Sequence, residues 1–321
     1  MIEIDEGDPE NIQPAPLSGR EDNDTDVFAT ASPQQRVALE PRWVQLPASG
    51  MLAVEDADGL LRWRDASIVA VLGERNGGKT TLAVEFYERF AKGVYAGFNF
   101  AHSLSLLGFE EKTFQSRAVS GAEMPDTPRT SKQDGLKFFH LAVTGETCGR
   151  KDLLISERAG EIYRDVRDNP SLANTITEVR KARTVAFILD GERIADPLRR
   201  MEALASVRDL ARAFTRAGSI SIDCEIQIVT TKWDLLIGPD AAVAKGVLED
   251  FERRFIETYM GKFGEISVFH VAARDPTGTV AAGYGMEPLF KSWLAVRPKA
   301  KSPGPEMPQL VNEFDRLLMR G

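Results

Sequence analysis

The chain has 321 residues, 43% of them hydrophobic, which is enough for one large domain or two small ones. Its formal net charge is −8, and residues 1–40 carry ten acidic and two basic residues, so the imbalance lies at the N-terminus. The rest is balanced in charge and lacks a lysine and arginine cluster with interleaved aromatics, which argues against nucleic-acid binding. Because the sequence has no secretory signal and no apolar run of about 18 residues, we expect a cytoplasmic protein without a membrane partner.

Composition divides the chain into four parts. Residues 1–45 are acidic, polar and proline-rich, and we expect a disordered arm because they bury too little surface to offset the entropy of ordering. Residues 46–296 form the expected globular domain, and residues 297–305 a proline-rich linker. Residues 306–321 place apolar side chains at helical spacing, which predicts an amphipathic helix that docks on a protein partner or on its own domain.

Short apolar runs alternate with helical patterns through the globular part. The expected strands are residues 68–73, 136–143, 152–157, 184–191, 225–231 and 265–273. The expected helices are residues 81–92, 195–216 and 241–260, with an inserted helix over residues 100–114. Strands that are apolar throughout are buried on both faces. The sequence therefore predicts an α/β fold with a doubly wound, mainly parallel sheet and helices on both faces.

The first expected strand is followed by GERNGGKTT, which satisfies the pattern G-x-x-x-x-G-K-[ST]. Its glycines allow the backbone to approach phosphate, and successive N–H groups at a helix N-terminus bind the anion. Lys79 would contact the β- and γ-phosphates, and the Thr80 hydroxyl would ligate Mg²⁺. Residues 73–80 are here called the phosphate loop. The predicted phosphate-binding residues, which include Thr81 just after this loop, are Gly73, Asn76, Gly77, Gly78, Lys79, Thr80 and Thr81.

Two later strand ends carry a second set of residues. TTKWD, here called the base loop (residues 230–234), and Ala273-Arg274 resemble the [NT]-K-x-D and S-A-K motifs of the Ras-like, translation-factor-related GTPase superfamily. A carboxylate accepts guanine N1–H and N2–H₂ as a pair, whereas adenine presents a bare N1 acceptor. We therefore expect Asp234 to select GTP and GDP. Lys232 and Arg274 would cover the two faces of the base, and Thr231 and the Ala273 N–H would complete the site.

The segment ISERAGE resembles the D-x-x-G segment of switch II in the same superfamily. The resemblance implies that Glu157 replaces the aspartate that orients a Mg²⁺-bound water and that the Gly160 N–H senses the γ-phosphate. It places Glu161 at the position of the catalytic glutamine. An ionised carboxylate only accepts hydrogen bonds, so Glu161 would have to act as a general base beside an unfavourable phosphate charge.

Other candidates for catalysis are less directly indicated. Thr130, with Thr127 as a substitute, precedes the second expected strand and would give the switch I hydroxyl to Mg²⁺ and the γ-phosphate. Asn76 matches the asparagine that helps bind K⁺ in potassium-activated members, or else it only provides a left-handed backbone conformation. Arg75 and Arg158 are further sources of positive charge. The predicted catalytic residues are Lys79, Glu161, Asn76 and Thr130, and the predicted metal ligands are Thr80, Thr130 and Glu157.

Together with the long insert between Lys79 and Thr130, which contains the expected helix over residues 100–114, these motifs resemble the double-GTPase group of bacterial conflict and defence systems. The resemblance covers roughly residues 66–296. Membership implies a GTP-hydrolysing switch that acts with partner proteins. Two alternatives remain. TVAFILDGER would be the Walker B strand of an ATPase, with Asp190 on Mg²⁺ and Glu192 activating water. Otherwise the chain would be a GTP-bound scaffold with little turnover.

Overall fold

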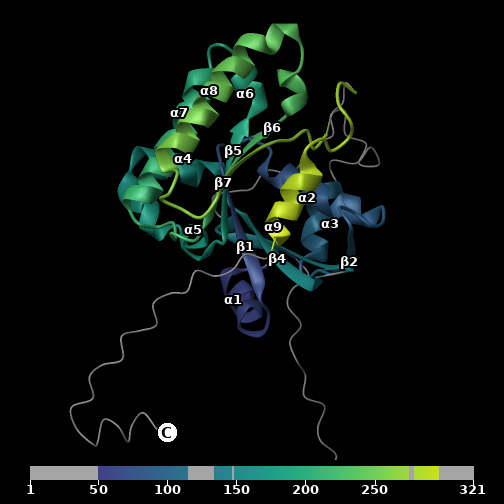
Figure 1. The fold of residues 1–321 in the computed structure, drawn as a ribbon. Coiled ribbons are helices and arrows are strands. Elements are labelled where there is room, and N and C mark those ends of the chain that lie inside the picture. The colour runs from purple at the N-terminus through teal and green to yellow at the C-terminus, as the bar shows by residue number, and fades with distance from the viewer. Residues whose placement is uncertain (1–49, 115–133, 147, 275–277, 296–321) are drawn as a thin grey trace, which may run out of the picture. The chain divides into compact units, whose positions relative to one another are not determined.

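The computed structural model of the chain is drawn in Figure 1. The residues it describes are 50–114, 134–146, 148–274 and 278–295. Several expectations from the sequence fall outside these residues, namely the arm (1–45), the linker (297–305), the C-terminal helix (306–321), Thr127 and Thr130.

A seven-stranded sheet forms the centre of the described domain, with the order β2-β3-β4-β1-β5-β6-β7. The strands are β1 (Ala66–Leu72), β2 (Phe98–His102), β3 (Lys137–Gly145), β4 (Gly149–Glu157), β5 (Thr184–Asp190), β6 (Glu225–Thr231) and β7 (Ile266–His270). Strands β4, β1, β5, β6 and β7 are parallel, whereas β3 is antiparallel to β4 and β2 to β3. The predicted mainly parallel sheet is confirmed.

Helices cover both faces of this sheet (Figure 1). On one face lie α2 (Lys79–Ala91), α3 (Leu106–Phe114) and α9 (Met286–Leu294). On the other lie α4 (Gly160–Asp168), α5 (Thr177–Lys181), α6 (Gly191–Ala195), α7 (Arg200–Arg216) and α8 (Ala242–Tyr259). Helix α1 (Val54–Trp63) precedes β1, and short 3₁₀ segments are η3 (Pro170–Thr175), η4 (Trp233–Leu236) and η5 (Pro239–Ala241).

The central strand β1 shows why its sequence is apolar without interruption. Ile68, Ala70 and Leu72 are buried in the core that includes α4, α5 and α7, whereas Val69 and Val71 are buried in the core that includes α2 and α9. Successive side chains of a strand point to opposite faces, so a strand covered by helices on both sides needs apolar residues at every position. The doubly wound arrangement that was predicted is confirmed.

Two expected helices differ from the structure. Residues 100–114 were expected to be one helix, but their first part belongs to β2, which pairs with β3 through Phe98 and Gly145. Pairing with a neighbouring strand decided the conformation there, because β2 is largely exposed and has no strong pattern of its own. The helix expected over residues 195–216 begins only at Arg200 as α7, because Ala195 ends α6 and Pro197, whose ring and missing N–H interrupt a helix, lies between the two.

None of the helices in the described ranges is both long enough and apolar enough to cross a membrane.

Candidate functional site

The phosphate loop joins the end of β1 to the start of α2. Lys79 begins α2, and its Nζ donates hydrogen bonds to the carbonyl oxygens of Gly73 (2.8 Å) and Glu74 (2.9 Å). Burial lowers the pKa of the Lys79 ammonium, opposed by the charges of nearby carboxylates, Glu157 first among them. The loop thus encloses the ammonium at the N-terminus of a 13-residue helix, where backbone N–H groups bind anions.

The two left-handed residues of the loop have different explanations. Gly78, with φ +83°, caps α2 and takes a conformation that favours glycine. Asn76 has φ +63°, and asparagine is one of the few residues with a side chain that adopts this region readily. Its conformation alone therefore accounts for an asparagine at position 76, and a role in binding K⁺ stays a prediction.

Thr80 and Glu157 come together although they lie 77 positions apart. The Thr80 hydroxyl donates to Glu157 Oε1 at 2.6 Å, and Glu157 is buried at the end of β4, the strand beside β1. Hydroxyl and carboxylate oxygens are the ligands that Mg²⁺ takes from proteins, and substrate phosphates and water supply the rest. These two residues therefore fit a Mg²⁺ ion, and the longer glutamate side chain reaches the threonine hydroxyl.

The segment ISERAGE (residues 155–161) lies directly against the phosphate loop. A Cβ atom at Gly160 would overlap the Arg75 nitrogen and lie 2.6 Å from the Glu74 carbonyl carbon, so only glycine permits this approach. Glu161 faces the same loop, with its Oε1 3.6 Å from Arg75 Nε. Arg158 does not, because its guanidinium pairs with the buried Glu178 of α5 at 2.7 Å. A contribution of Arg158 to the charge at the phosphate site stays a prediction.

The base loop is joined to the phosphate loop. Thr231 Oγ1 lies 2.8 Å from the Gly77 carbonyl oxygen and 3.2 Å from that of Leu189. Trp233 N donates to the Val271 oxygen at 3.1 Å, which joins the base loop to the end of β7. Asp234 is 8% exposed in η4, on the same edge of the sheet as the phosphate loop. Ligands of such sheets bind at the carboxyl ends of the strands, where these loops lie.

Residues 67–294 match the family model DO-GTPase2, described as Double-GTPase 2. The chain belongs to the Double-GTPase 2 family. The match begins at β1 and ends with α9, and it contains every motif described above. No curated protein matches this Double-GTPase 2 chain.

Three solved structures are similar to the Double-GTPase 2 chain at low identity. The signal recognition particle receptor SRb-GTP/SRX complex from Chaetomium thermophilum has 15% identity and a TM-score of 0.39, covering 72% of this chain and 97% of that chain. Translation elongation factor SelB from Methanococcus maripaludis, in complex with the GTP analogue GppNHp, has 9% identity and a TM-score of 0.35. The match covers 74% of this chain and 37% of that chain. The third structure is the ADP ribosylation factor-like GTP-binding protein, small COPII coat GTPase Sar1, from Encephalitozoon cuniculi in complex with GDP. It has 12% identity and a TM-score of 0.31, and the match covers 75% of this chain and 92% of that chain.

The acids of the ATPase alternative lie against the base loop of this Double-GTPase 2 chain. Lys232 Nζ is 3.0 Å from Asp190 Oδ1 and 2.6 Å from Glu192 Oε2. Burial alone would lower the pKa of Lys232, but the two carboxylates outweigh it and raise that pKa. Glu157, and not Asp190, is the carboxylate that contacts the Thr80 hydroxyl. The sequence did not predict these partners of Lys232.

Arg274 and Ala273 follow β7 at the same edge. The Arg274 guanidinium forms an ion pair with Glu85 of α2, and Ala273 is half-buried. The contact with Glu85 was not predicted. The stacking of Arg274 on a base stays a prediction.

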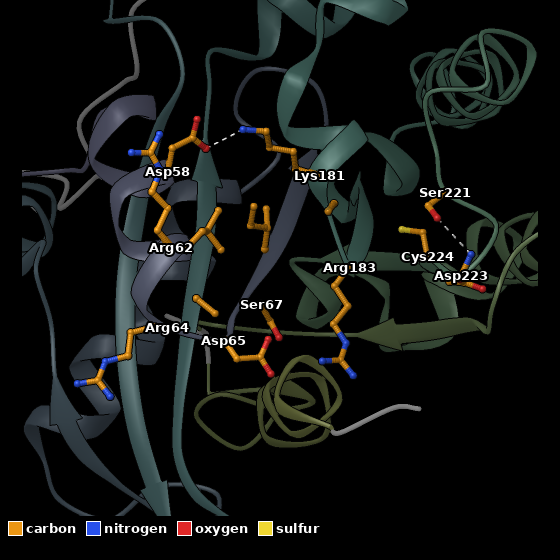
Figure 2. Close-up of a pocket in the computed structure, with 14 residues that line it drawn as sticks. Asp58, Arg62, Arg64, Asp65, Ser67, Lys181, Arg183, Ser221, Asp223 and Cys224 are labelled. Carbon is orange, nitrogen blue, oxygen red and sulfur yellow. Dashed lines mark hydrogen bonds and ion pairs between the residues drawn. The ribbon is translucent and has the colours of Figure 1, made fainter. Parts of the chain in front are cut away.

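A cavity of about 650 Å³ lies at the amino ends of the parallel strands, opposite the carboxyl ends where the phosphate loop and the base loop lie (Figure 2). It is lined by the amino end of β1, by residues 181–183 just before β5, and by charged side chains such as Arg62, Lys181 and Arg183. One of its cations is already neutralised, since Lys181 Nζ lies 2.6 Å from Asp58 Oδ1. No predicted site residue lines this cavity, so it is separate from the candidate nucleotide site.

Proposed function

We propose that the chain binds GTP and GDP across the phosphate loop and the base loop and hydrolyses GTP as a molecular switch. The observation that carries this proposal is the 2.8 Å contact between Thr231 Oγ1 and the Gly77 oxygen, because it joins the loop that bears Asp234 to the loop that bears Lys79. Asp234 would accept the two guanine donors and the Ala273 N–H would meet O6. Lys232 and Arg274 would lie over the two faces of the base.

Mg²⁺, when bound, would neutralise negative charge on the β- and γ-phosphates. Thr80 and Glu157 would hold it, directly or through water, and the 2.6 Å contact between them supports this assignment. Thr130 is proposed as the switch I ligand. The Gly160 N–H would sense the γ-phosphate from its position against the phosphate loop.

We propose that turnover is slow without additional positive charge. A carboxylate at Glu161 cannot orient water as an amide does, and in this conformation it faces Arg75. Arg75 from the phosphate loop, or K⁺ held by Asn76, would supply the missing charge at the γ-phosphate. A scaffold that stays GTP-bound is the alternative.

Calorimetry with GDP, GTP and ATP on one sample tests the nucleotide assignment. We expect the affinities for GTP and GDP to exceed that for ATP by about 100-fold or more, because adenine would leave the Asp234 carboxylate facing the lone pair of its N1 atom. Multiple-turnover phosphate release should then be faster in K⁺ than in Na⁺, and Asn76→Ala should remove the difference. Equal affinity for ATP would contradict the guanine assignment. GTP binding without sustained phosphate release would support the scaffold, and equal rates in both salts would exclude the K⁺ role.

Substitution of two carboxylates separates the GTPase assignment from the ATPase alternative. Glu157→Gln is expected to raise the Mg²⁺ concentration needed for half-maximal GTP binding about tenfold, because a neutral amide replaces the ligand beside Thr80. Asp190→Asn should change this requirement less, since Asp190 contacts Lys232 instead. Mg²⁺ titrations with a fluorescent GTP analogue measure both. A larger effect at Asp190 would favour a Walker B role.

The resemblance to bacterial conflict and defence systems extends the proposal to a partner protein in the cytoplasm that binds one nucleotide state. Capture of a different set of proteins by GTP-analogue-loaded and GDP-loaded chain would support it, and identical sets would contradict it.

A further inference from the structure

Glu74, the second residue of the phosphate loop, has an unusual concentration of cationic partners. Its carboxylate oxygens lie 2.8 Å from Arg167 Nη1, 3.1 Å from Arg164 Nη2 and 3.5 Å from Arg193 Nη1. The Ser206 hydroxyl also donates to it at 2.7 Å. The Glu74 side chain is 11% exposed, and these contacts outweigh its burial and lower its pKa.

The partners of Glu74 come from three helices. Arg164 and Arg167 lie on α4, Arg193 on α6 and Ser206 on α7. An ion pair repays the desolvation of a buried carboxylate only with good geometry and further hydrogen bonds, and additional pairs near the surface add little stability. The arrangement therefore does more than stabilise one acid, because it brings three helices to one point of the phosphate loop.

Helix α4 is attached to the phosphate loop at two places. Its first residue, Gly160, packs on the loop backbone, and the Glu74 carboxylate holds Arg164 and Arg167. These positions are separated by four and then three residues, which places them on the same face of the helix. A shift of the loop backbone would therefore change the contacts of α4 both at its start and along this face.

Helix α6 is joined to the loop through the same carboxylate. Arg193 Nη1 lies 3.5 Å from Glu74, while its Nη2 donates to the Arg75 carbonyl oxygen at 3.3 Å. Arg193 also approaches Asp190 at 3.7 Å, so its charge is shared between two acids. A shift of the Glu74–Arg75 backbone would therefore change contacts to α4 and α6 together.

We propose that Glu74 is a positioning residue that couples the phosphate loop to α4, so that α4 takes a different position when a γ-phosphate is bound. The proposal rests on the proposed binding of GTP. By linkage, a residue that lets α4 respond to the γ-phosphate also contributes to the preference for GTP over GDP. A residue that only holds the fold together would change both affinities alike.

Glu74→Gln tests the coupling, because glutamine keeps the shape and an acceptor for Ser206 while removing the charge that holds the arginines. In the unmodified chain, hydrogen exchange over residues 160–168 should differ between GDP and a non-hydrolysable GTP analogue. In Glu74→Gln this difference should disappear, and the ratio of GTP-analogue to GDP affinity should fall about tenfold.

Glu178→Gln is the matched control. Glu178 is also a buried acid. It pairs with Arg158 at 2.7 Å and accepts a hydrogen bond from the Tyr163 hydroxyl of α4 at 3.3 Å, but its contacts are not with the phosphate loop. This variant should keep both the affinity ratio and the exchange difference. If Glu74→Gln does not fold, the double variant Arg164→Gln, Arg167→Gln removes the same contact from the α4 side and should give the same loss.

Three results would overturn the coupling by Glu74. They are an affinity ratio that stays within about twofold in a folded variant, an equal loss in Glu178→Gln, and no exchange difference in the unmodified chain. A preference of the unmodified chain for ATP would instead contradict the proposed function, and that measurement precedes the variants.

Discussion

Replacement of Lys79 by alanine is expected to lower the affinity for GTP about 100-fold or more while leaving the fold intact. The ammonium lies inside the phosphate loop, 2.8 Å and 2.9 Å from two carbonyl oxygens, where a bound triphosphate would receive charge-assisted hydrogen bonds from it. Loss of such bonds in a partly desolvated site costs about 3 kcal/mol, which corresponds to this change in affinity. Calorimetric titration with GTP measures it.

Lys92→Ala is the control for Lys79→Ala. Lys92 caps the other end of α2 and is exposed, so its removal deletes a lysine from the same helix without touching the loop. Both variants should keep cooperative thermal unfolding near that of the unmodified chain. If Lys79→Ala binds GTP within about threefold of the unmodified chain, the triphosphate binds outside the phosphate loop.

The strands at the centre of the sheet could be predicted from sequence because burial on both faces requires an uninterrupted apolar run. The prediction for residues 225–231 coincides with β6, and that for residues 184–191 exceeds β5 by one residue. Strand β2 was missed because it lies at the edge of the sheet and its residues are largely exposed. Its conformation depends on pairing with β3, which no pattern within residues 98–102 encodes.

The site shows the same division between local and tertiary information. Thr80 was predicted as a Mg²⁺ ligand from the phosphate-loop motif and Glu157 from the resemblance of ISERAGE to switch II. The structure brings the two side chains together because they lie at the carboxyl ends of the neighbouring parallel strands β1 and β4. The arginines around Glu74 gave no such signal. Arg164 and Arg167 lie on a short polar helix, where the sequence pattern predicts solvent-exposed side chains. Their partner Glu74 lies 90 and 93 residues away in the sequence.

Asp234→Asn is expected to change the base preference of the nucleotide site. If the Asp234 carboxylate accepts guanine N1–H and N2–H₂, asparagine places an N–H₂ donor where an acceptor is needed. The affinity for GTP should fall by about 2–4 kcal/mol, or roughly 30- to 1,000-fold, from a lost charge-assisted pair and a new donor clash. Titration with GTP and xanthosine triphosphate measures both sides of the change.

Xanthine carries an oxo group in place of the guanine 2-amino group, so it can accept a hydrogen bond from the new amide. The variant should therefore lose GTP and gain xanthosine triphosphate, whereas a variant with a damaged loop would lose GTP without gaining xanthosine triphosphate. Because Thr231 and Trp233 hold the base loop through contacts with Gly77 and Val271, the asparagine should occupy the same place as the aspartate.

Asp240→Asn provides the control, since Asp240 is an exposed acid in η5 six positions further along the chain. It should keep the nucleotide preference of the unmodified chain, which separates a change of base recognition from a change of net charge. A structural aspartate, or a surface loop of an ATPase, would leave base preference unchanged at position 234. Parental GTP affinity in folded Asp234→Asn would therefore remove the guanine assignment and return attention to Asp190 and Glu192, whose carboxylates already share Lys232 at the end of β5.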